Sequence, residues 1–282
     1  MSRFWLSAGV AAALSCASVL AYAATPAYVD AALSDAARPQ ADRDSDAARK
    51  PADMIDFAGI KPGMTVVDIS PGGGYFTRIF AKVVGANGKV FAVNNPPRPR
   101  PAAPPAGAAP GGAAGGPPPG GPAGGPPGGG RGGPPGGGRG PQPPLNEGYP
   151  NVELVTTAPI VQGFTLPQKA DVMWTSRNYH DFKNASPDLS AFNKAVFDGL
   201  KPGGIFVVLD HAADESDTPD VTSRLHRIQE SRVKAEVVAA GFKLVGESTV
   251  LRNPQDDHKG SNAEADLRGH TDQFILKFQK PG

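Results

Sequence analysis

A stretch of 49 residues, 96–144, limits what this chain of 282 residues can fold into. The stretch contains 18 Pro, 18 Gly, 8 Ala, 4 Arg and one Gln, and no aromatic or larger aliphatic side chain. It therefore cannot bury enough apolar surface to offset the entropy of ordering its backbone. Collagen is excluded because Gly does not recur at every third position. We expect a disordered Pro/Gly/Ala-rich insert between two folded segments.

The first 23 residues predict an export signal. Arg3 is followed by an apolar stretch over 4–20, and AYA at 21–23 forms a small-x-small cleavage site. The alternatives are a short membrane anchor, which needs about 20 apolar residues and a charged stop, and a lipoprotein acylated at Cys16, past which the apolar run continues. Because Cys16 is the only cysteine, the mature chain would have no disulfide or thiolate site. The expected location is periplasmic or secreted, with no membrane span after signal removal.

Without the signal and the insert, 210 residues remain, which suits one domain with one hydrophobic core. They carry 23 basic and 27 acidic side chains, whereas the insert is purely basic. This balance does not indicate a specific nucleic-acid partner. We expect a helical N-terminal preamble over 24–60, followed by one domain made of 61–95 and 145–282.

Apolar strands alternate with amphipathic helices through most of this domain. Strands are expected at 64–69, 89–94, 151–156, 171–176 and 205–210. Helices are expected at 75–84, 187–200 and 221–240. This alternation predicts an α/β fold with a doubly wound parallel sheet. The last two strands, 242–250 and 273–278, are joined by a polar loop without room for a long helix, so a closing antiparallel pair is expected.

A glycine-rich turn follows the first expected strand, where an open α/β sheet binds its ligands. Glycines let the backbone approach a ligand, and the next helix offers free amide hydrogens to a carboxylate or phosphate. Asp68, two residues before the turn, can meet an ammonium group. A plain tight turn without a ligand is the alternative. A nicotinamide-dependent oxidoreductase is disfavoured because Thr77 stands where its fingerprint requires Gly or Ala.

Two motifs resemble those of class I S-adenosylmethionine-dependent methyltransferases: VVDISPGGGYF at 66–76 and LKPGGI at 200–205. The chain is also similar to a group of exported bacterial predicted methyltransferases in ADRD at 41–44, RNYHD at 177–181 and TDQFILKF at 271–278. The resemblance implies a Rossmann-like seven-stranded sheet with an antiparallel last strand and S-adenosyl-L-methionine as cofactor. It also implies methyl transfer to an O or N nucleophile of a small molecule or protein.

The resemblance further implies a set of cofactor-binding residues at the strand ends. They are Asp68, Gly72, Gly73, Gly74, Tyr75, Asn94, Arg177 and Asn178. In the family an acid usually ends the second strand and binds the ribose hydroxyls. Here Asn94 or Asn95 takes that place, which offers hydrogen bonds but no charge.

Candidate catalytic residues follow the fourth and fifth expected strands. His180 is the candidate general base, because an imidazole with a pKa near roughly 6.5 accepts a proton at neutral pH. Asp210 and His211 are candidates for orienting the acceptor. The alternatives are that His180 only orients its loop, and that Asp210 and His211 form a simple pair at a strand end.

No metal centre is predicted, because His226, His258 and His270 show no metal-ligand spacing with a carboxylate. An exported, non-catalytic binding module that retains the fold is the second hypothesis. It is motivated by the missing ribose acid and by the lack of an obvious cofactor supply outside the cytoplasm. The sequence specifies neither the acceptor nor the oligomeric state.

The insert follows the second expected strand, on the ligand side of the sheet. Its four arginines make it a positively charged flap beside the expected cofactor crevice. Deleting residues 97–143 is therefore expected to leave the melting temperature nearly unchanged.

Overall fold

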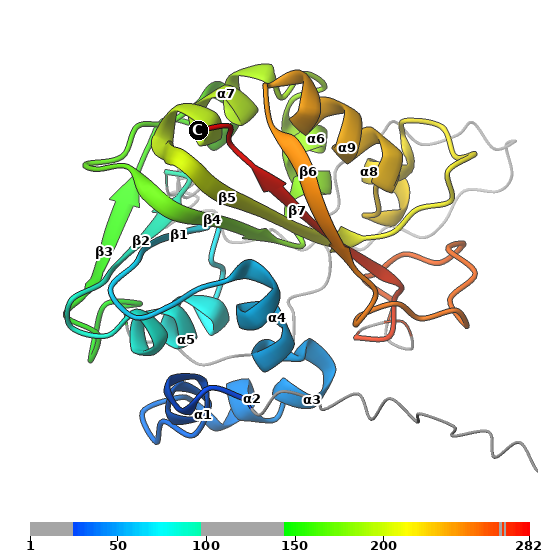
Figure 1. Cartoon of the computed structure of the whole chain (residues 1–282). Helices are drawn as coiled ribbons and strands as arrows, with labels where there is room; N and C mark the ends of the chain where they lie inside the picture. The colour runs from blue at the N-terminus through cyan, green and yellow to red at the C-terminus, as the bar shows by residue number, and fades with distance from the viewer. Residues whose placement is uncertain (1–24, 97–143, 265–266, 268) are drawn as a thin grey trace, which may run out of the picture.

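The computed structural model describes residues 25–96, 144–264, 267 and 269–282. The expectations for the signal at 1–23 and for nearly all of the insert concern residues outside these ranges. Figure 1 shows three layers, in which one sheet lies between two groups of helices. Within the described ranges, no helix has the length and hydropathy needed to cross a membrane.

The sheet contains seven strands, and their order across it differs from their order in the chain. The order is β3 (Val152–Thr156), β2 (Lys89–Asn94), β1 (Thr65–Ile69), β4 (Ala170–Ser176), β5 (Leu200–His211), β7 (Gln273–Gln279) and β6 (Lys243–Ser248). The first five are parallel, and β7 runs antiparallel to both β5 and β6. The predicted doubly wound sheet with an antiparallel last strand is confirmed.

Helices cover both faces of this sheet (Figure 1). On one face lie α5 (Tyr75–Val84) and the N-terminal helices α1 (Ala27–Leu33), α2 (Gln40–Arg43), α3 (Asp46–Arg49) and α4 (Pro51–Ala58). On the other lie α6 (Tyr179–Ala185), α7 (Ser190–Gly199), α8 (Val221–Leu225) and α9 (Glu230–Ala239). Each face has its own cluster of buried apolar side chains, as expected for strands buried on both sides.

One ion pair joins the N-terminal helices to α5, and a second lies within the N-terminal segment itself. Arg78 of α5 pairs with Asp42 of α2, and both side chains are almost fully buried. Arg38 donates to both carboxylate oxygens of Asp46, at 2.9 and 2.6 Å. The preamble therefore packs as part of the domain, directly behind the helix that follows the glycine turn.

The predicted helix over 221–240 is wrong, because the structure divides it into α8 and α9. The chain leaves α8 at His226, which has a left-handed φ of 52°. Ile228 then forms a bridge with Ala212 beyond the end of β5 and is fully buried. Burial of this side chain outweighs the local preference for a continuous helix.

Two short elements were not predicted from the sequence, α6 and the 3-10 helix η1 (Ile160–Gln162). Each spans at most seven residues, which is too short for a clear helical periodicity. Two residues separate α6 from β4, and α6 carries His180 in its first turn. The candidate base therefore lies on a helix rather than in a loop.

Candidate functional site

The turn between β1 and α5 has a backbone that suits glycine. Gly72 and Gly74 have left-handed φ values of 56° and 77°. A Cβ on Gly72 would meet nothing within 4 Å, whereas a Cβ on Gly74 would lie 2.3 Å from a side-chain carbon of Leu145. Gly72 therefore faces open space, and Gly74 allows the segment after the insert to pack closely on the turn. Ser70 also has a positive φ, 56°, which is strained for a residue with a side chain.

A cavity of about 240 Å³ opens beside this turn, between the ends of β1 and β4. Six of the eight predicted cofactor-binding residues line it: Asp68, Gly72, Gly73, Tyr75, Arg177 and Asn178. They come from two segments more than 100 residues apart, which the parallel pairing of β1 with β4 brings together. Gly74 and Asn94 are not among its lining residues in the described part of the chain.

Asp68 is buried at the base of this cavity, with 3% of its surface exposed. The hydroxyl of Thr77 donates a hydrogen bond to its carboxylate at 2.6 Å. Burial raises the pKa of Asp68 to about 6, although the Thr77 hydrogen bonds and the charge of Arg49 act in the opposite direction. The ionised carboxylate is therefore incompletely stabilised by the protein alone.

The opposite wall is formed by the residues that follow β4. Arg177 has a φ of 60°, and its amide donates to the carbonyl of Leu209 at 2.7 Å. Burial, and then the positive charge of Arg49, lowers its pKa to about 10. The side-chain amide of Asn178 donates to the carbonyl of Ser70 at 3.1 Å. Asn178 therefore supports the strained turn, and Arg177 supplies a cation at the cavity wall.

The N-terminal helices complete the cavity through Arg49, which sequence reasoning missed. Its guanidinium lies over the ring of Tyr75, 4.3 Å from the centroid. The hydroxyl of Tyr75 donates to Asp46 at 2.6 Å. Tyr75 thus presents its ring to the cavity while its hydroxyl is bound to the preamble. No motif around residue 49 indicates this role, because only packing of α3 against α5 creates it.

The second strand ends in the two asparagines considered for the ribose. Asn95 accepts a hydrogen bond from the amide of Ile160 at 2.8 Å, so its oxygen holds η1 in place. Asn94, the last residue of β2, is partly exposed, and its side-chain amide makes a long 3.5 Å contact with the carbonyl of Ala92. Asn94 is the less engaged of the two, and its contact with a ribose stays a prediction.

The three candidate catalytic residues meet at the ends of β4 and β5. One oxygen of Asp210 lies 2.7 Å from Nδ1 of His180 and also accepts from the amide of His211 at 2.8 Å. The other accepts from the amide of His180 at 2.9 Å. Burial favours the neutral acid, yet the charge and hydrogen bonds of His180 hold the pKa of Asp210 below its usual range. Both oxygens of Asp210 therefore have hydrogen-bond partners within the protein, and through them Asp210 positions both histidines.

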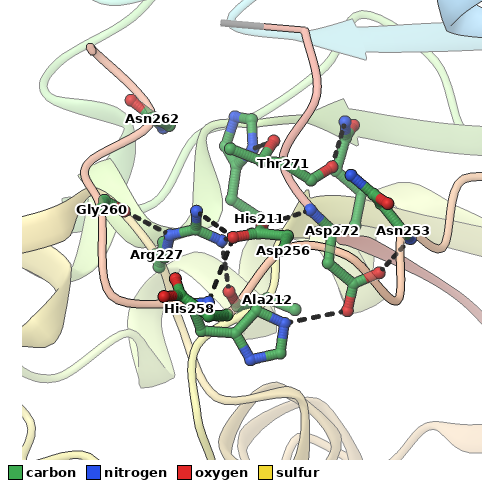
Figure 2. A network of polar contacts seen from close by, with 12 residues as sticks. His211, Ala212, Arg227, Asn253, Asp256, His258, Gly260, Asn262, Thr271 and Asp272 are labelled. Carbon is green, nitrogen blue, oxygen red and sulfur yellow. Dashed lines mark hydrogen bonds and ion pairs between the residues drawn. The ribbon is translucent and has the colours of Figure 1, made fainter. Parts of the chain in front are cut away.

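The two histidines differ in how they titrate. Burial alone would lower the pKa of His180, but the charge and hydrogen bond of Asp210 raise it above the usual value. Burial lowers the pKa of His211 to about 3. Nδ1 of His211 lies 2.7 Å from the hydroxyl oxygen of Thr271 (Figure 2). At neutral pH the His211 ring is therefore uncharged, and one of its nitrogens is hydrogen-bonded to Thr271.

Figure 2 shows a buried network that fastens the loop between β6 and β7 to the end of β5. Arg227 donates to both oxygens of Asp256, at 2.7 and 3.0 Å, and to the carbonyl of Ala212 at 3.0 Å. His258 lies 3.1 Å from Asp272, so it is engaged within the loop rather than simply solvated. The network holds this loop against the end of β5, where His211 lies.

The fold also assembles a cluster that spacing along the chain did not reveal. His226, at the end of α8, lies beside the first turn of α6, with its ring centroid 5.7 Å from that of His180. Together with Asp181 the two histidines place three potential ligand atoms within 4.8 Å of one another. The histidines are 46 positions apart, so no sequence motif could indicate this cluster.

A larger, open hollow of about 1130 Å³ lies elsewhere, between β3, η1 and α7. None of the predicted site residues lines it. Four buried groups with shifted pKa values, Asp68, Arg177, His180 and His211, lie instead near the ends of β1, β4 and β5. Because perturbed pKa values are frequent at functional sites, the smaller cavity and its surroundings are the better candidate for the functional site.

Known proteins with similar features point to methyltransferases. A family model described as protein-L-isoaspartate(D-aspartate) O-methyltransferase matches residues 3–98, about a third of the chain. A search of curated proteins gave no match. A solved S-adenosylmethionine-dependent methyltransferase from Aquifex aeolicus is 16% identical, with a TM-score of 0.51 over 86% of this chain and 95% of that one.

A second similar solved structure is named for an activity other than methyl transfer. The [4+2]-cyclase SpnF is 12% identical and has a TM-score of 0.50, over 83% of this chain and 81% of that one. The chain therefore has the Rossmann-like methyltransferase fold. Its function has to be argued from its own site.

Proposed function

We propose that this protein binds S-adenosylmethionine and transfers its methyl group to an O or N nucleophile of a small-molecule or protein acceptor. The observation that carries the proposal is the buried Asp68, whose pKa of about 6 reflects a carboxylate that the protein stabilises incompletely. A ligand ammonium group would supply the missing positive charge. The family-model match and the methyltransferase fold support the same cofactor.

The residues present fit the amino-acid end of the cofactor. α5 begins at Tyr75 with no side-chain cap, so the amide hydrogens of Tyr75 and Phe76 can bind a carboxylate, whereas the amide of Thr77 bonds to Asp68. Gly72 and Gly73 line the same cavity without side chains that would obstruct it. An α-amino acid carries an ammonium and a carboxylate on one carbon, and the cavity offers Asp68 to the first and the start of α5 to the second.

The bound cofactor would supply an activated sulfonium methyl, so the protein's task is mainly to align the acceptor with it. The acceptor side would be formed by the residues after β4 and β5. In this proposal Asp210 is a positioning residue, and His211 is a weak base because of its low pKa. Of the predicted catalytic residues, His180 keeps one ring nitrogen, Nε2, that is not held by Asp210.

Calorimetric titration of the purified chain with S-adenosylmethionine and with its demethylated product tests the proposal. We expect binding of both, and at least a tenfold weaker affinity in Asp68→Ala. Asp56→Asn, a change at an exposed aspartate of α4, is the matched control and should bind normally. Absence of binding to the wild-type chain would contradict the proposal.

An exported, non-catalytic binding module is the second candidate. Asn94 favours it, because an uncharged residue at the end of β2 gives the ribose a weaker partner than an acid. Mass spectrometry of the ligand that co-purifies with the chain separates the two. The cofactor or its demethylated product would support methyl transfer, whereas a different nucleotide or a lipid would support the binding module.

We also propose that the chain acts in the periplasm or outside the cell, as its first 23 residues suggest. Cell fractionation followed by N-terminal sequencing tests this. The expected result is a mature chain that begins at Ala24 in the exported fraction. An uncleaved chain in the cytoplasmic fraction would contradict it.

A further inference from the structure

Three side chains meet at the contact between α6 and the end of α8: His180, Asp181 and His226. One oxygen of Asp181 lies 3.4 Å from Nε2 of His180 and 3.5 Å from Nδ1 of His226. The carboxylate thus faces a nitrogen of each ring. Among the described residues, this is the group of histidine and acidic side chains whose ligand atoms converge closely enough to hold one metal ion.

The two distances from Asp181 to the histidine rings match those between ligands around a metal. Both contacts exceed the 2.7–3.2 Å expected for an N–H···O hydrogen bond. In a tetrahedral zinc site, bonds of about 2.0–2.2 Å place neighbouring ligand atoms roughly 3.3–3.6 Å apart. The two contacts of Asp181 fall inside that interval. Two imidazoles and a carboxylate also form a donor set that suits zinc, with a fourth position left open.

A second observation concerns the orientation of His180. Asp210 lies 2.7 Å from its Nδ1 and is fixed in turn by the amides of His180 and His211. A carboxylate that accepts the Nδ1 proton leaves the lone pair of Nε2 directed at Asp181. This is the arrangement in which a histidine ligand of a metal is held by a carboxylate behind it.

Neighbouring segments of the protein hold the backbone at His226 in place. Its φ of 52° is unusual for a residue with a side chain. The side-chain amide of Asn262 donates to its carbonyl at 2.8 Å, and the next residue, Arg227, is anchored to Asp256. The buried network of Figure 2 therefore fixes the backbone that carries the third donor.

We propose that His180, Asp181 and His226 bind a divalent transition metal, zinc by the chemistry of the donors. The side chains of Asp181 and His226 are 54% and 42% exposed, so an ion can reach the site and a further ligand can take its open position. The inference does not rest on the proposed function. A metal on Nε2 would occupy the lone pair that a general base needs, so the two roles of His180 exclude each other.

Titration of the tag-free chain with zinc chloride, followed by calorimetry, tests the proposal. We expect one zinc ion per chain, and affinities weaker by at least about tenfold in Asp181→Asn and in His226→Asn, since loss of a ligand should cost no less than the roughly 10–100-fold lost with a residue that only supports a ligand. Asn tolerates the left-handed conformation at 226, and Asp181 is exposed, so both variants should fold. His270→Asn changes an exposed histidine outside the cluster and should bind zinc as the wild type does.

Titration with cobalt(II) in place of zinc is an independent test, because a tetrahedral cobalt(II) site with nitrogen and oxygen donors absorbs visible light strongly. We expect this absorption in the wild-type chain and its loss in His226→Asn. Absence of zinc binding, or equal binding by all variants, would overturn the proposal. Zinc binding without S-adenosylmethionine binding would contradict only the proposed function, and the reverse result would contradict only the metal site.

Discussion

Two buried aspartates, Asp68 near the end of β1 and Asp210 near the end of β5, lie on either side of β4 and have opposite electrostatic surroundings. Asp210 accepts hydrogen bonds from two backbone amides and contacts an imidazole, and its pKa is lowered. Asp68 is bonded by Thr77, and burial raises its pKa to about 6. The protein therefore stabilises the ionised form of Asp210 fully and that of Asp68 only in part.

The difference separates two kinds of polar residue. A carboxylate whose partners are all within the protein organises structure, and here Asp210 orients His180 and His211. A carboxylate that is buried but incompletely stabilised lowers the stability of the free protein and gains most when a cation binds. Asp68 is of the second kind, which is why the cavity beside it is the better candidate for the cofactor.

The largest effect on stability is expected from Asp210→Asn. The substitution replaces one accepting oxygen by an NH2 group that faces an N–H donor, and it removes the charge that pairs with His180, so the free energy of unfolding should fall by about 3–5 kcal/mol. Urea denaturation measures this. Asp181→Asn, at an exposed neighbour, is the control and should change it by no more than about 0.5 kcal/mol. A loss below about 1 kcal/mol in Asp210→Asn would mean that Asp210 is not the organising residue.

Asp68→Asn should instead raise the free energy of unfolding. The neutral amide avoids the burial of a charge while still accepting the Thr77 hydroxyl, so the free protein should gain about 1–3 kcal/mol at pH 7. Affinity for S-adenosylmethionine should fall at least tenfold in the same variant. Urea denaturation and calorimetry check the two results. A destabilised variant would show that the Asp68 carboxylate supports the fold as Asp210 does.

The gain in Asp68→Asn should also depend on pH. The folded-state pKa of Asp68, about 6, lies above the unfolded value, so the folded chain binds more protons between about pH 4 and pH 6. The contribution of Asp68 to stability therefore falls as pH rises through this window. We expect wild type and variant to be equally stable below about pH 4 and to differ fully above about pH 6. A constant difference across this range would contradict the raised pKa.

The smallest effect is expected from Thr77→Val. This change removes the hydroxyl that donates to Asp68 and keeps the approximate shape of the buried side chain, so it should cost about 1.5 kcal/mol at pH 7, where Asp68 is mostly ionised. In the Asp68→Asn background the cost should be smaller, because the hydrogen bond then joins two neutral groups. Equal costs in both backgrounds, measured by urea denaturation, would show that Thr77 does not act through Asp68.

The sequence predicted one side of the site better than the other for a physical reason. Asp68 and the glycines of the turn are contiguous, so a strand, a turn and a helix in succession place them together. Parallel strand ends meet at one edge of a sheet, so the proximity of Arg177 and Asp210 was also predictable. The alternation of strands and helices followed from hydrophobic patterns, and the antiparallel ending from the short polar connection before the last strand and from the resemblance.

The residues that sequence reasoning missed depend on packing between distant segments. Arg49 reaches the cavity because α3 docks beside α5, and His226 reaches His180 because the chain breaks its helix to bury Ile228. Local propensity favours a continuous helix over 221–240, and the buried contacts made by Ile228 and Arg227 override it. Neither position could be inferred from the spacing of residues along the chain.

The most direct test of the central claim is the pKa of Asp68, measured by NMR of its carboxyl carbon with and without S-adenosylmethionine. The account predicts a pKa of about 6 in the free chain and a value below about 4 in the complex, because the ligand ammonium would stabilise the ionised form. A pKa near the ordinary value in the free chain, or one that does not change when the ligand binds, would contradict it.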